Sequence, residues 1–212
     1  MTTPTGRGWW RRNRWWLPVV PLALAAMLAA SSIRLGTFWW EADYHRATQE
    51  VAAGEWADVR DGGTDALGDF ERHFRVRLDA LTEVERFAPP ESSAVQELPP
   101  GTRAVAAHLE FEADPEEPLA GCTVVLVGSD GVLYGGDTSD AYDQSSQCVP
   151  ADRPGPLLAL LGTETERTTA PGEERPEQWT TAPVMVVPDD ARIIAVQIRY
   201  EPPDYLVLRA QD

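Results

Sequence analysis

Few side chains in this sequence are placed to do chemistry, and three aspartates form the strongest candidate site. Asp137, Asp140 and Asp143 recur every three residues in a polar segment that follows Asp130. Carboxylate oxygens are hard ligands that suit Ca²⁺, although the spacing is not that of an EF-hand. In so acidic a chain, three aspartates in a loop are also typical of a solvated turn. A calcium site and an ordinary polar loop therefore both stay open.

The histidines and the serine of the sequence Gly-Ser-Asp-Gly offer weaker sites. His73 and His108 fall on solvent-facing positions of predicted strands, and two ligands without a nearby cysteine make a poor metal site. Ser129 lacks the spacing of a hydrolase nucleophile elbow and follows a predicted hairpin strand. No phosphate-binding glycine loop and no Cys/His zinc pattern occur. The sequence therefore predicts no catalytic residue and no cofactor.

Cys122 and Cys148 are the two cysteines of the chain. In an oxidising compartment an even pair is typical of one disulfide, and two free thiols are the alternative. The bond would close a 27-residue loop and contribute roughly 3 to 4 kcal/mol in the chain-entropy model. It would also remove both thiols as nucleophiles.

The compartment follows from residues 15–40, which read WWLPVVPLALAAMLAASSIRLGTFWW. From Leu17 to Ile33 there are 17 residues without a charge, which is the short end of what crosses a bilayer. Tryptophan pairs at the two ends would lie about 36 Å apart in a helix, close to the separation of the two interfaces. We expect a retained transmembrane helix over 15–40. A signal peptide cleaved after Ser31 is the alternative.

Charge is divided between the two ends of the chain. Residues 1–40 carry five arginines and no acid, whereas the rest holds all 34 acids against 13 arginines, a formal charge of −21. Arginines before the apolar run favour a cytoplasmic N-terminus (residues 1–14) and an acidic C-terminal part outside the membrane. Such a surface repels nucleic acid. The residues expected at the membrane interface are Trp15, Trp16, Trp39, Trp40, Arg11, Arg12 and Arg14.

Beyond the membrane we expect two parts, a helical stalk over 41–54 and a β-sandwich over 55–212. Trp40, Tyr44, Ala47 and Val51 repeat at helical spacing, and Gly54 would end that helix. Asp61-Gly62-Gly63 then predicts a turn.

From Phe70 the period changes to two, which predicts short strands near 70–84, 105–112, 122–127, 132–134, 184–187, 194–200 and 206–208. Turns rich in Pro, Gly and Asp separate them, so the fold class is an antiparallel β-sandwich. The segment Pro150 to Gln178 predicts a long surface loop. Trp56 and Trp179 are expected near loops, either exposed for stacking on sugars or buried at the ends of the sandwich.

The sequence resembles a family of bacterial extracytoplasmic immunoglobulin-like domains. The resemblance lies in four segments that follow one membrane span, HFRVRLDAL, PPGTRAVAAHLEF, CTVVLVGSDGVLY and PDDARIIAVQIRY. That family occurs on lipoproteins and single-pass membrane proteins of GC-rich Gram-positive bacteria, and its function is unknown. The resemblance covers roughly Phe70 to Arg209 and implies a fold and a location, not an activity. No cysteine lies near the apolar run, so this chain departs from the lipoprotein pattern.

The function expected from the sequence is that of a membrane-anchored extracytoplasmic binding or scaffold protein of the cell envelope, without catalysis. Its partners would be the lipid bilayer and an envelope protein or wall component. A membrane-tethered hydrolase with a site built from loops is the alternative, and it would need a pocket that combines a serine or a carboxylate pair with a base. A pure spacer that uses the 41–53 stripe is a third hypothesis.

Overall fold

The structure is a computed structural model, which describes residues 13–16, 18–35, 43–85, 97–135, 147–159, 166–168 and 174–211. The chain forms two compact units, Met1–Asp43 and Tyr44–Asp212. The predicted boundary between stalk and sandwich, at residue 54, is therefore not a boundary of the structure.

The described part of the first unit includes the helix α2 (Val19–Leu35). Pro21 is accommodated because it lies in the first turn, where backbone N–H groups have no partner within the helix. Apolar side chains are exposed on several sides of α2, among them Leu22, Met27 and Leu28. At 17 residues its length is about 25 Å. No helix in the described part of the chain reaches the length and apolar character required to cross a membrane.

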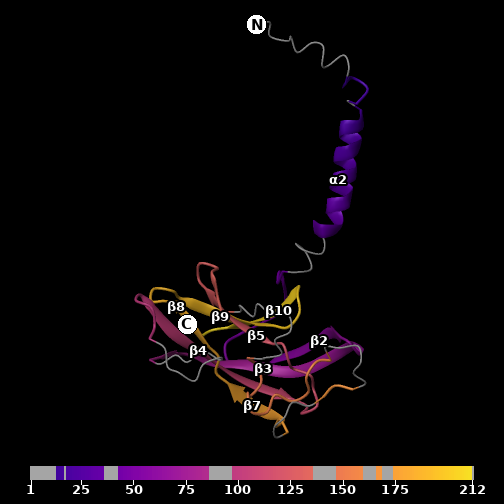
Figure 1. The fold of residues 1–212 in the computed structure, drawn as a ribbon. Coiled ribbons are helices and arrows are strands. Elements are labelled where there is room, and N and C mark those ends of the chain that lie inside the picture. The colour runs from indigo at the N-terminus through magenta and orange to yellow at the C-terminus, as the bar shows by residue number, and fades with distance from the viewer. Residues whose placement is uncertain are drawn as a thin grey trace. The chain divides into compact units, whose positions relative to one another are not determined.

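The second unit is a β-sandwich of two sheets (Figure 1). Its strands are β1 (Arg46–Val51), β2 (Ala57–Asp65), β3 (Gly68–Val84), β4 (Thr102–Ala113), β5 (Thr123–Gly128), β6 (Leu133–Tyr134), β7 (Gln178–Thr181), β8 (Val184–Pro188), β9 (Ile193–Arg199) and β10 (Asp204–Arg209).

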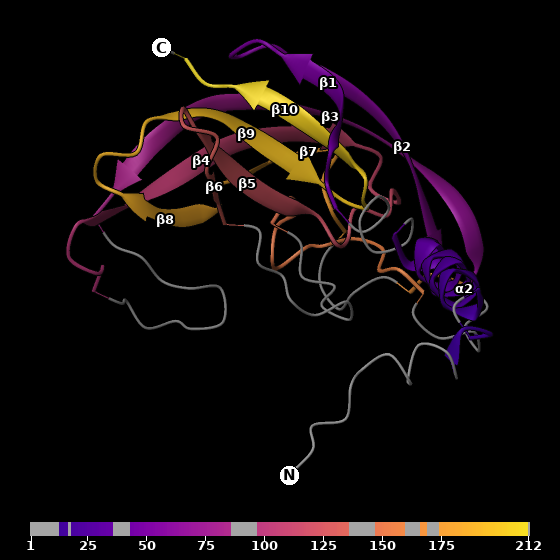
Figure 2. The same cartoon turned by 90° about the horizontal axis from the view of Figure 1, so that it is seen from above.

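One sheet has the order β1-β10-β9-β5-β6, and the other β2-β3-β4-β7, with β8 also paired to β4. Figure 2 shows β1, β10, β9 and β5 side by side in one layer. All pairings are antiparallel except that of β1 with β10, which is parallel. The chain changes sheet after β1, β4, β6 and β8, so its core lies between the two inner faces.

The predicted strand at 70–84 is confirmed and forms all of β3 except its first two residues, with an irregularity that the period did not show. Phe74, Val76 and Leu78 are buried as expected. A bulge between Leu78 and Ala80 then shifts the register against β4, and because side chains alternate, it reverses the two faces. Ala80 and Thr82 are exposed, whereas Leu81, which broke the predicted alternation, is half-buried against the core.

The helical stalk predicted over 41–54 is wrong for its described residues. Residues 46–51 form β1, which pairs in parallel with β10. Val51 is buried in the core, whereas Ala47 is exposed. The helical spacing of the apolar residues did not predict the conformation, because Arg46 to Glu50 are polar or small. Pairing with the apolar strand β10 outweighs their local helix preference.

The turn predicted at Asp61-Gly62-Gly63 is also wrong, because these residues lie in β2 and pair with Arg72, Glu71 and Phe70. The turn of this hairpin comes later, at residues 66–67. Gly63 is needed for space rather than for a turn, since a Cβ there would collide with the Arg72 guanidinium and the Phe70 ring.

Other predicted elements are confirmed. Thr123 to Leu126 in β5 are buried, as expected for a central strand, and the turn at Asp130-Gly131 leads into β6. In β4, Val105, Ala107, Leu109 and Phe111 face the core. In β10, Leu206 and Leu208 do the same. In β8 the buried residues are Met185 and Val187 rather than their neighbours Val184 and Val186.

Candidate functional site

A cleft of about 400 Å³ opens between the two sheets at the end where β3 finishes. We call it the β3 cleft. Its apolar floor is formed by Leu78, Leu81, Val105, Ile193 and Ile194. A volume of this size falls within the range of ligand pockets in proteins, 300 to 1,000 Å³ in order of magnitude.

The cleft exists because β3 is longer than the strand beside it. β2 pairs with β3 only as far as Val76, opposite Ala57. On the other side of β3, pairing with β4 continues as far as Val84. From Arg77 to Val84, therefore, no described strand pairs with β3 on the β2 side, and the sheets are left open there.

Charged groups line the rim of the cleft. Asp79 and Glu83 stand on β3, and Arg103 and Arg192 come from β4 and from the turn before β9. Arg103 donates from Nη2 to the carbonyl of Ala191 at 2.8 Å and contacts Glu83 at 3.3 Å. Its Nε is buried and makes no hydrogen bond to a described residue. The cleft thus combines apolar side chains with charged groups of both signs.

The described residues that line the cleft include no serine, cysteine or histidine. Thr82, on its edge, lies with Oγ1 2.7 Å from Nε2 of His108, within the reach that a hydroxyl nucleophile and its base require. Within the described residues no carboxylate hydrogen-bonds His108 to orient it, so this pair lacks the third group of a triad.

The two histidines weighed as metal ligands are not brought together. His73 contacts Asp58 at 3.1 Å, and His108 contacts Thr82. On β3 the residue opposite His108 is Ala80. Ala80 and His73 are seven positions apart, so the two histidines are separated by roughly 23 Å along the strand. No group of three or more possible metal ligands occurs in the described part of the chain. Asp137, Asp140 and Asp143, the predicted calcium ligands, lie outside the described residues.

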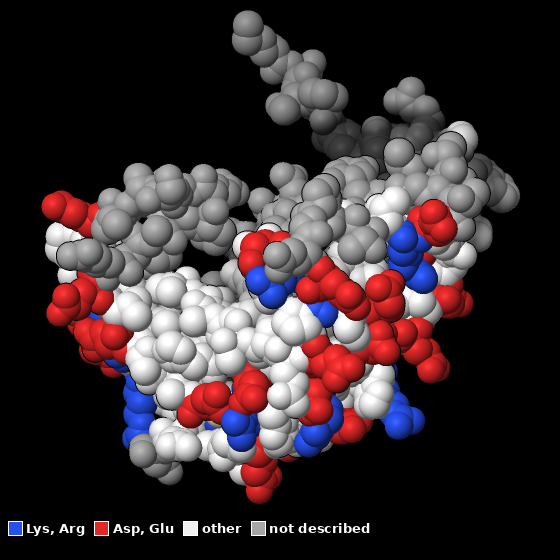
Figure 3. Space-filling model, turned by 90° about the horizontal axis from the view of Figure 1, so that it is seen from below, with Lys and Arg blue, Asp and Glu red and all other residues white. Residues whose placement is uncertain are grey.

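The outer face of the β2-β3-β4 sheet is covered by paired charges. Arg75 pairs with Glu112, and Arg77 pairs with Glu110 and with Asp79. Figure 3 shows acidic and basic side chains intermixed on the face that it presents. Trp56 is half-buried, and the guanidinium groups of Arg75 and Arg77 lie 4.8 and 4.9 Å from the centre of its ring.

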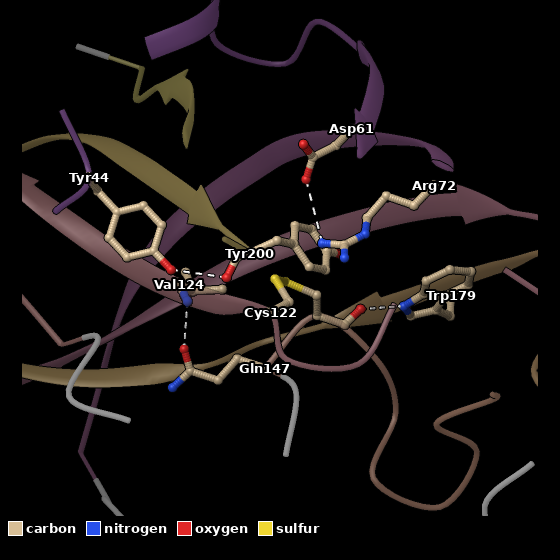
Figure 4. The surroundings of a disulfide bond; sticks show 9 residues. Tyr44, Asp61, Arg72, Cys122, Val124, Gln147, Trp179 and Tyr200 are labelled. Carbon is tan, nitrogen blue, oxygen red and sulfur yellow. Dashed lines mark hydrogen bonds and ion pairs between the residues drawn. A yellow bond between two sulfur atoms is a disulfide. The ribbon is translucent and has the colours of Figure 1, made fainter. Parts of the chain in front are cut away.

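The predicted disulfide between Cys122 and Cys148 is present, and both residues are fully buried. The neighbouring backbone is held by hydrogen bonds (Figure 4). Gln147 accepts from the Val124 N–H at 2.7 Å, and its own N–H donates to the Cys122 carbonyl at 3.1 Å. Trp179 is buried and donates from Nε1 to the Cys148 carbonyl at 2.8 Å. Of the two fates considered for Trp179, the structure shows the buried one.

Two buried arginines, which the sequence did not single out, stand at the ends of a row of four aromatic rings. Arg72 lies 4.3 Å from the ring of Tyr200, which neighbours Phe74. Phe74 neighbours Phe111, which stacks on Trp179 with an angle of 4° between the planes. Arg175 covers the far side of Trp179 at 4.8 Å. Each arginine is about 1% exposed. Burial raises the pKa of the Tyr200 hydroxyl, which therefore stays neutral.

Arg72 and Arg175 are satisfied in different ways. Arg72 contacts two carboxylates, that of Asp61 at 3.4 Å (Figure 4) and that of Glu201 at 3.3 Å. Burial raises the pKa of Asp61 in spite of this arginine. Arg175 donates to the carbonyls of Asp114, Glu117 and Pro154. Burial lowers its pKa, and the three carbonyls compensate the buried guanidinium.

Arg175 also explains part of the long segment from Pro150 to Gln178. It ties residue 154 to the β4–β5 connection. A second attachment is made by Asp65, whose carboxylate accepts from the Ala159 N–H and from Arg167. Burial raises the pKa of Asp65, but these hydrogen bonds and one from Leu67 N–H outweigh it, and the pKa is lowered. The described parts of this predicted loop are therefore fixed to the sandwich.

Comparisons with known proteins find distantly similar solved structures and indicate no activity. No protein-family model matches the chain, and no curated protein matches it. An uncharacterized β-sandwich protein from Clostridium difficile 630 aligns with 80% of this chain and 98% of its own length, at 9% identity and a TM-score of 0.40. A conserved hypothetical protein from Bacillus anthracis aligns with 68% of this chain and 89% of its own, at 15% identity and a TM-score of 0.31. Likenesses this distant carry no functional argument.

Proposed function

We propose that this protein is a membrane-anchored binding or scaffold protein, in which the N-terminal segment holds the β-sandwich on the outer side of a cell membrane. No catalytic step is part of the proposal. The β3 cleft is the proposed binding site, and an envelope protein or wall component is the proposed partner.

The proposed membrane anchor is supported by the apolar character of α2. A helix that is apolar all round is stable only where an apolar environment surrounds it, in a protein core or in lipid. In this structure Leu22 is 71%, Met27 61% and Leu28 68% exposed, so the unit itself supplies no such environment. The segment proposed to span, 15–40, extends beyond α2 at both ends, and residues 36–40 lie outside the described ones.

Two further features support an outer location for the sandwich. Arginines at positions 7, 11, 12 and 14 precede the apolar run and favour retention of that end in the cytoplasm. The disulfide between Cys122 and Cys148 is typical of proteins that fold in an oxidising compartment.

An immunoglobulin-like arrangement belongs to the same proposal. The β5-β9-β10 order of one sheet corresponds to strands C, F and G of such domains, and the pairing of β4 with β7 and β8 corresponds to B with E. The disulfide differs, since it joins residues on either side of β5 and β6 rather than strands B and F. The correspondence is one of strand order.

Fractionation of cells that express the full chain tests the anchor. We expect the protein in the membrane fraction after alkaline carbonate washing. The double variant Leu24→Arg/Leu28→Arg places two charges in the apolar run and should move the protein to the soluble fraction. Ala52→Arg, at an exposed position of the sandwich, is the matched control and should leave it in the membrane. A wild-type chain released by the carbonate wash would refute the anchor.

A further inference from the structure

We propose that β1 is a releasable strap. It detaches from β10 while the rest of the sandwich stays folded, and its release lengthens the connection between the N-terminal segment and the sandwich. The biological setting of this device rests on the membrane anchor proposed above, whereas the release itself is a property of the sandwich unit.

β1 is held along one edge only. It is the outermost strand of its sheet and pairs in parallel with β10 through five residue pairs (Figure 2). The register shifts between Ala47 and Gln49, which interrupts the ladder of hydrogen bonds. No other strand of the described residues pairs with β1. Detachment of β1 therefore breaks one ladder and leaves the other strand pairings in place.

Most side-chain contacts of β1 are ones that water can replace. Val51, 6% exposed, belongs to the core, and the other residues of the strand are exposed. Arg46 pairs with Asp204, and Glu50 pairs with Arg209. The side chains of Arg46 and Glu50 are 64% and 53% exposed, and ion pairs this exposed contribute little to stability.

Two hydroxyl groups add hydrogen bonds to the attachment. Thr48 donates from Oγ1 to the carbonyl of Tyr205 at 3.2 Å, at an exposed position. The hydroxyl of Tyr44, which is half-buried, donates to the carbonyl of Tyr200 at 2.9 Å. Segments with few buried apolar contacts and water-accessible hydrogen bonds are those that open locally, without unfolding of the whole domain.

The residue types of β1 also disfavour its conformation. Arg46, Ala47, Gln49 and Glu50 all have a high helix preference, and alanine and glutamate are depleted in strands. Backbone pairing with β10 holds this segment against its local preference, so that preference favours release.

Release has a definite end point at the start of β2. Ala57 is fully buried and pairs with Val76. One residue earlier, the ring of Trp56 lies 4.8 and 4.9 Å from the guanidinium groups of Arg75 and Arg77. β10 stays in place as well, because β9 pairs with it on its other side. The part that detaches is therefore limited to the residues before Trp56.

Any pull between the N-terminal segment and the sandwich reaches β1 first. The two compact units divide between Asp43 and Tyr44, and β1 begins two residues later. Fully extended, residues 44–56 reach about 45 Å, whereas the docked strand of six residues covers about 20 Å. Release therefore adds on the order of 20 Å to the connection, which lets the sandwich meet a partner at different distances from its anchor.

Native-state hydrogen exchange of the full chain in detergent micelles tests the release. Mass spectrometry follows peptides of β1 and of β9 at denaturant concentrations below the unfolding transition. Val187→Ala, in the core of β8 and fully buried, destabilises the sandwich without touching the strap. Asp204→Asn removes the charge that pairs with Arg46, and Asp152→Asn, which removes the charge that pairs with Arg153 outside the strands, is its matched control.

We expect β1 to exchange at least about 100-fold faster than β9, with little dependence on denaturant. Val187→Ala should speed the exchange of β9 by about fivefold or more and leave that of β1 unchanged. Asp204→Asn should speed the exchange of β1 by about 1.5- to 5-fold, and Asp152→Asn should not. A β1 that follows β9 in denaturant dependence, or that responds to Val187→Ala, opens only with the whole sandwich. A β1 that exchanges like an unstructured peptide is not docked. Either result overturns the proposal.

Optical tweezers test the change in length. Handles are attached before Met1 and at Val132, an exposed position of the β5–β6 hairpin. We expect an extension step on the order of 20 Å at a lower force than unfolding of the sandwich. The variant Glu50→Cys/Val207→Cys, which joins residues paired between β1 and β10 by a disulfide, should lose that step. Its absence in the wild type, or its persistence in the locked variant, would contradict the strap. Both measurements use the purified chain, so failure of the anchor would be seen separately, by fractionation.

Discussion

Reduction of the Cys122–Cys148 bond should lower the stability of the sandwich without disturbing its native contacts. Three hydrogen bonds hold the two cysteine segments independently of the sulfur atoms. They run from Val124 N–H to Gln147, from Gln147 N–H to Cys122, and from Trp179 to Cys148. The native state should therefore change little on reduction, and the effect should arise in the unfolded chain, which gains freedom.

The magnitude follows from the length of the loop that the bond closes. The two cysteines are separated by 26 positions, and the chain-entropy model then gives about 3.5 kcal/mol at 25 °C. For a unit of the size of Tyr44–Asp212, each kcal/mol corresponds to about 2 to 4 °C in Tm. We therefore expect a fall of about 7 to 14 °C.

The assay is denaturant or thermal unfolding of the full chain in micelles, followed by far-UV circular dichroism, with and without a phosphine reductant. Cys122→Ala/Cys148→Ala is the control, because the reductant should not affect it. This variant should be somewhat less stable than the reduced wild type, since it also loses two buried sulfur atoms. A loss on reduction below about 1 kcal/mol would refute the reasoning and would indicate that the unfolded chain is already constrained.

Three further substitutions test individual contacts. Gly63→Ala should lower the free energy of unfolding by about 1 to 3 kcal/mol because its Cβ would meet Arg72 and Phe70. Gly62→Ala, whose Cβ meets only the Phe70 carbonyl at 3.9 Å, is the control, and equal losses in urea unfolding would contradict the packing. Trp179→Phe should cost about 1 to 3 kcal/mol in the same assay because the buried Cys148 carbonyl loses its donor. Trp56→Phe, on the outer face, should cost less than about 0.5 kcal/mol, and a comparable loss for both would count against the buried bond. Asp65→Asn should be destabilising at neutral pH. Since the pKa of Asp65 is lowered in the fold, its contribution is present above about pH 4, the ordinary pKa, and disappears as the pH falls through the folded pKa. The gap between wild type and variant should shrink on acidification, and a constant gap would contradict the assignment.

The strands of the sandwich could be predicted where one face is apolar and the other charged. This held for 105–111 in β4 and for 74–78 in β3, because burial of one face fixes alternation. It failed at the bulge after Leu78, which depends on the match between β3 and β4 and leaves only one sign in the sequence, an apolar Leu81 out of phase. It failed again at residues 46–51, where parallel pairing with β10, more than 150 positions away, decides the conformation.

The cleft and the two buried arginines were not predictable from local patterns. The cleft results from unequal strand lengths in three dimensions, since β2 begins only at Ala57, opposite Val76 in the middle of β3. Arg72 is a buried residue of β3, two residues before Phe74, and the predicted alternation of the strand did not include it. Gly62-Gly63 in the neighbouring strand β2 was the available signal that a large side chain from β3 needed space there. Arg175 gave no such signal, because its partners are backbone carbonyls from distant segments.

We propose that the sandwich lies outside the membrane while the N-terminus stays inside. Protease added to intact cells tests this topology, when the cells express the full chain with one tag before Met1 and another after Asp212. We expect the C-terminal tag to be lost and an N-terminal fragment to remain in the membrane fraction. Protection of both tags until the cells are lysed would overturn the proposed topology.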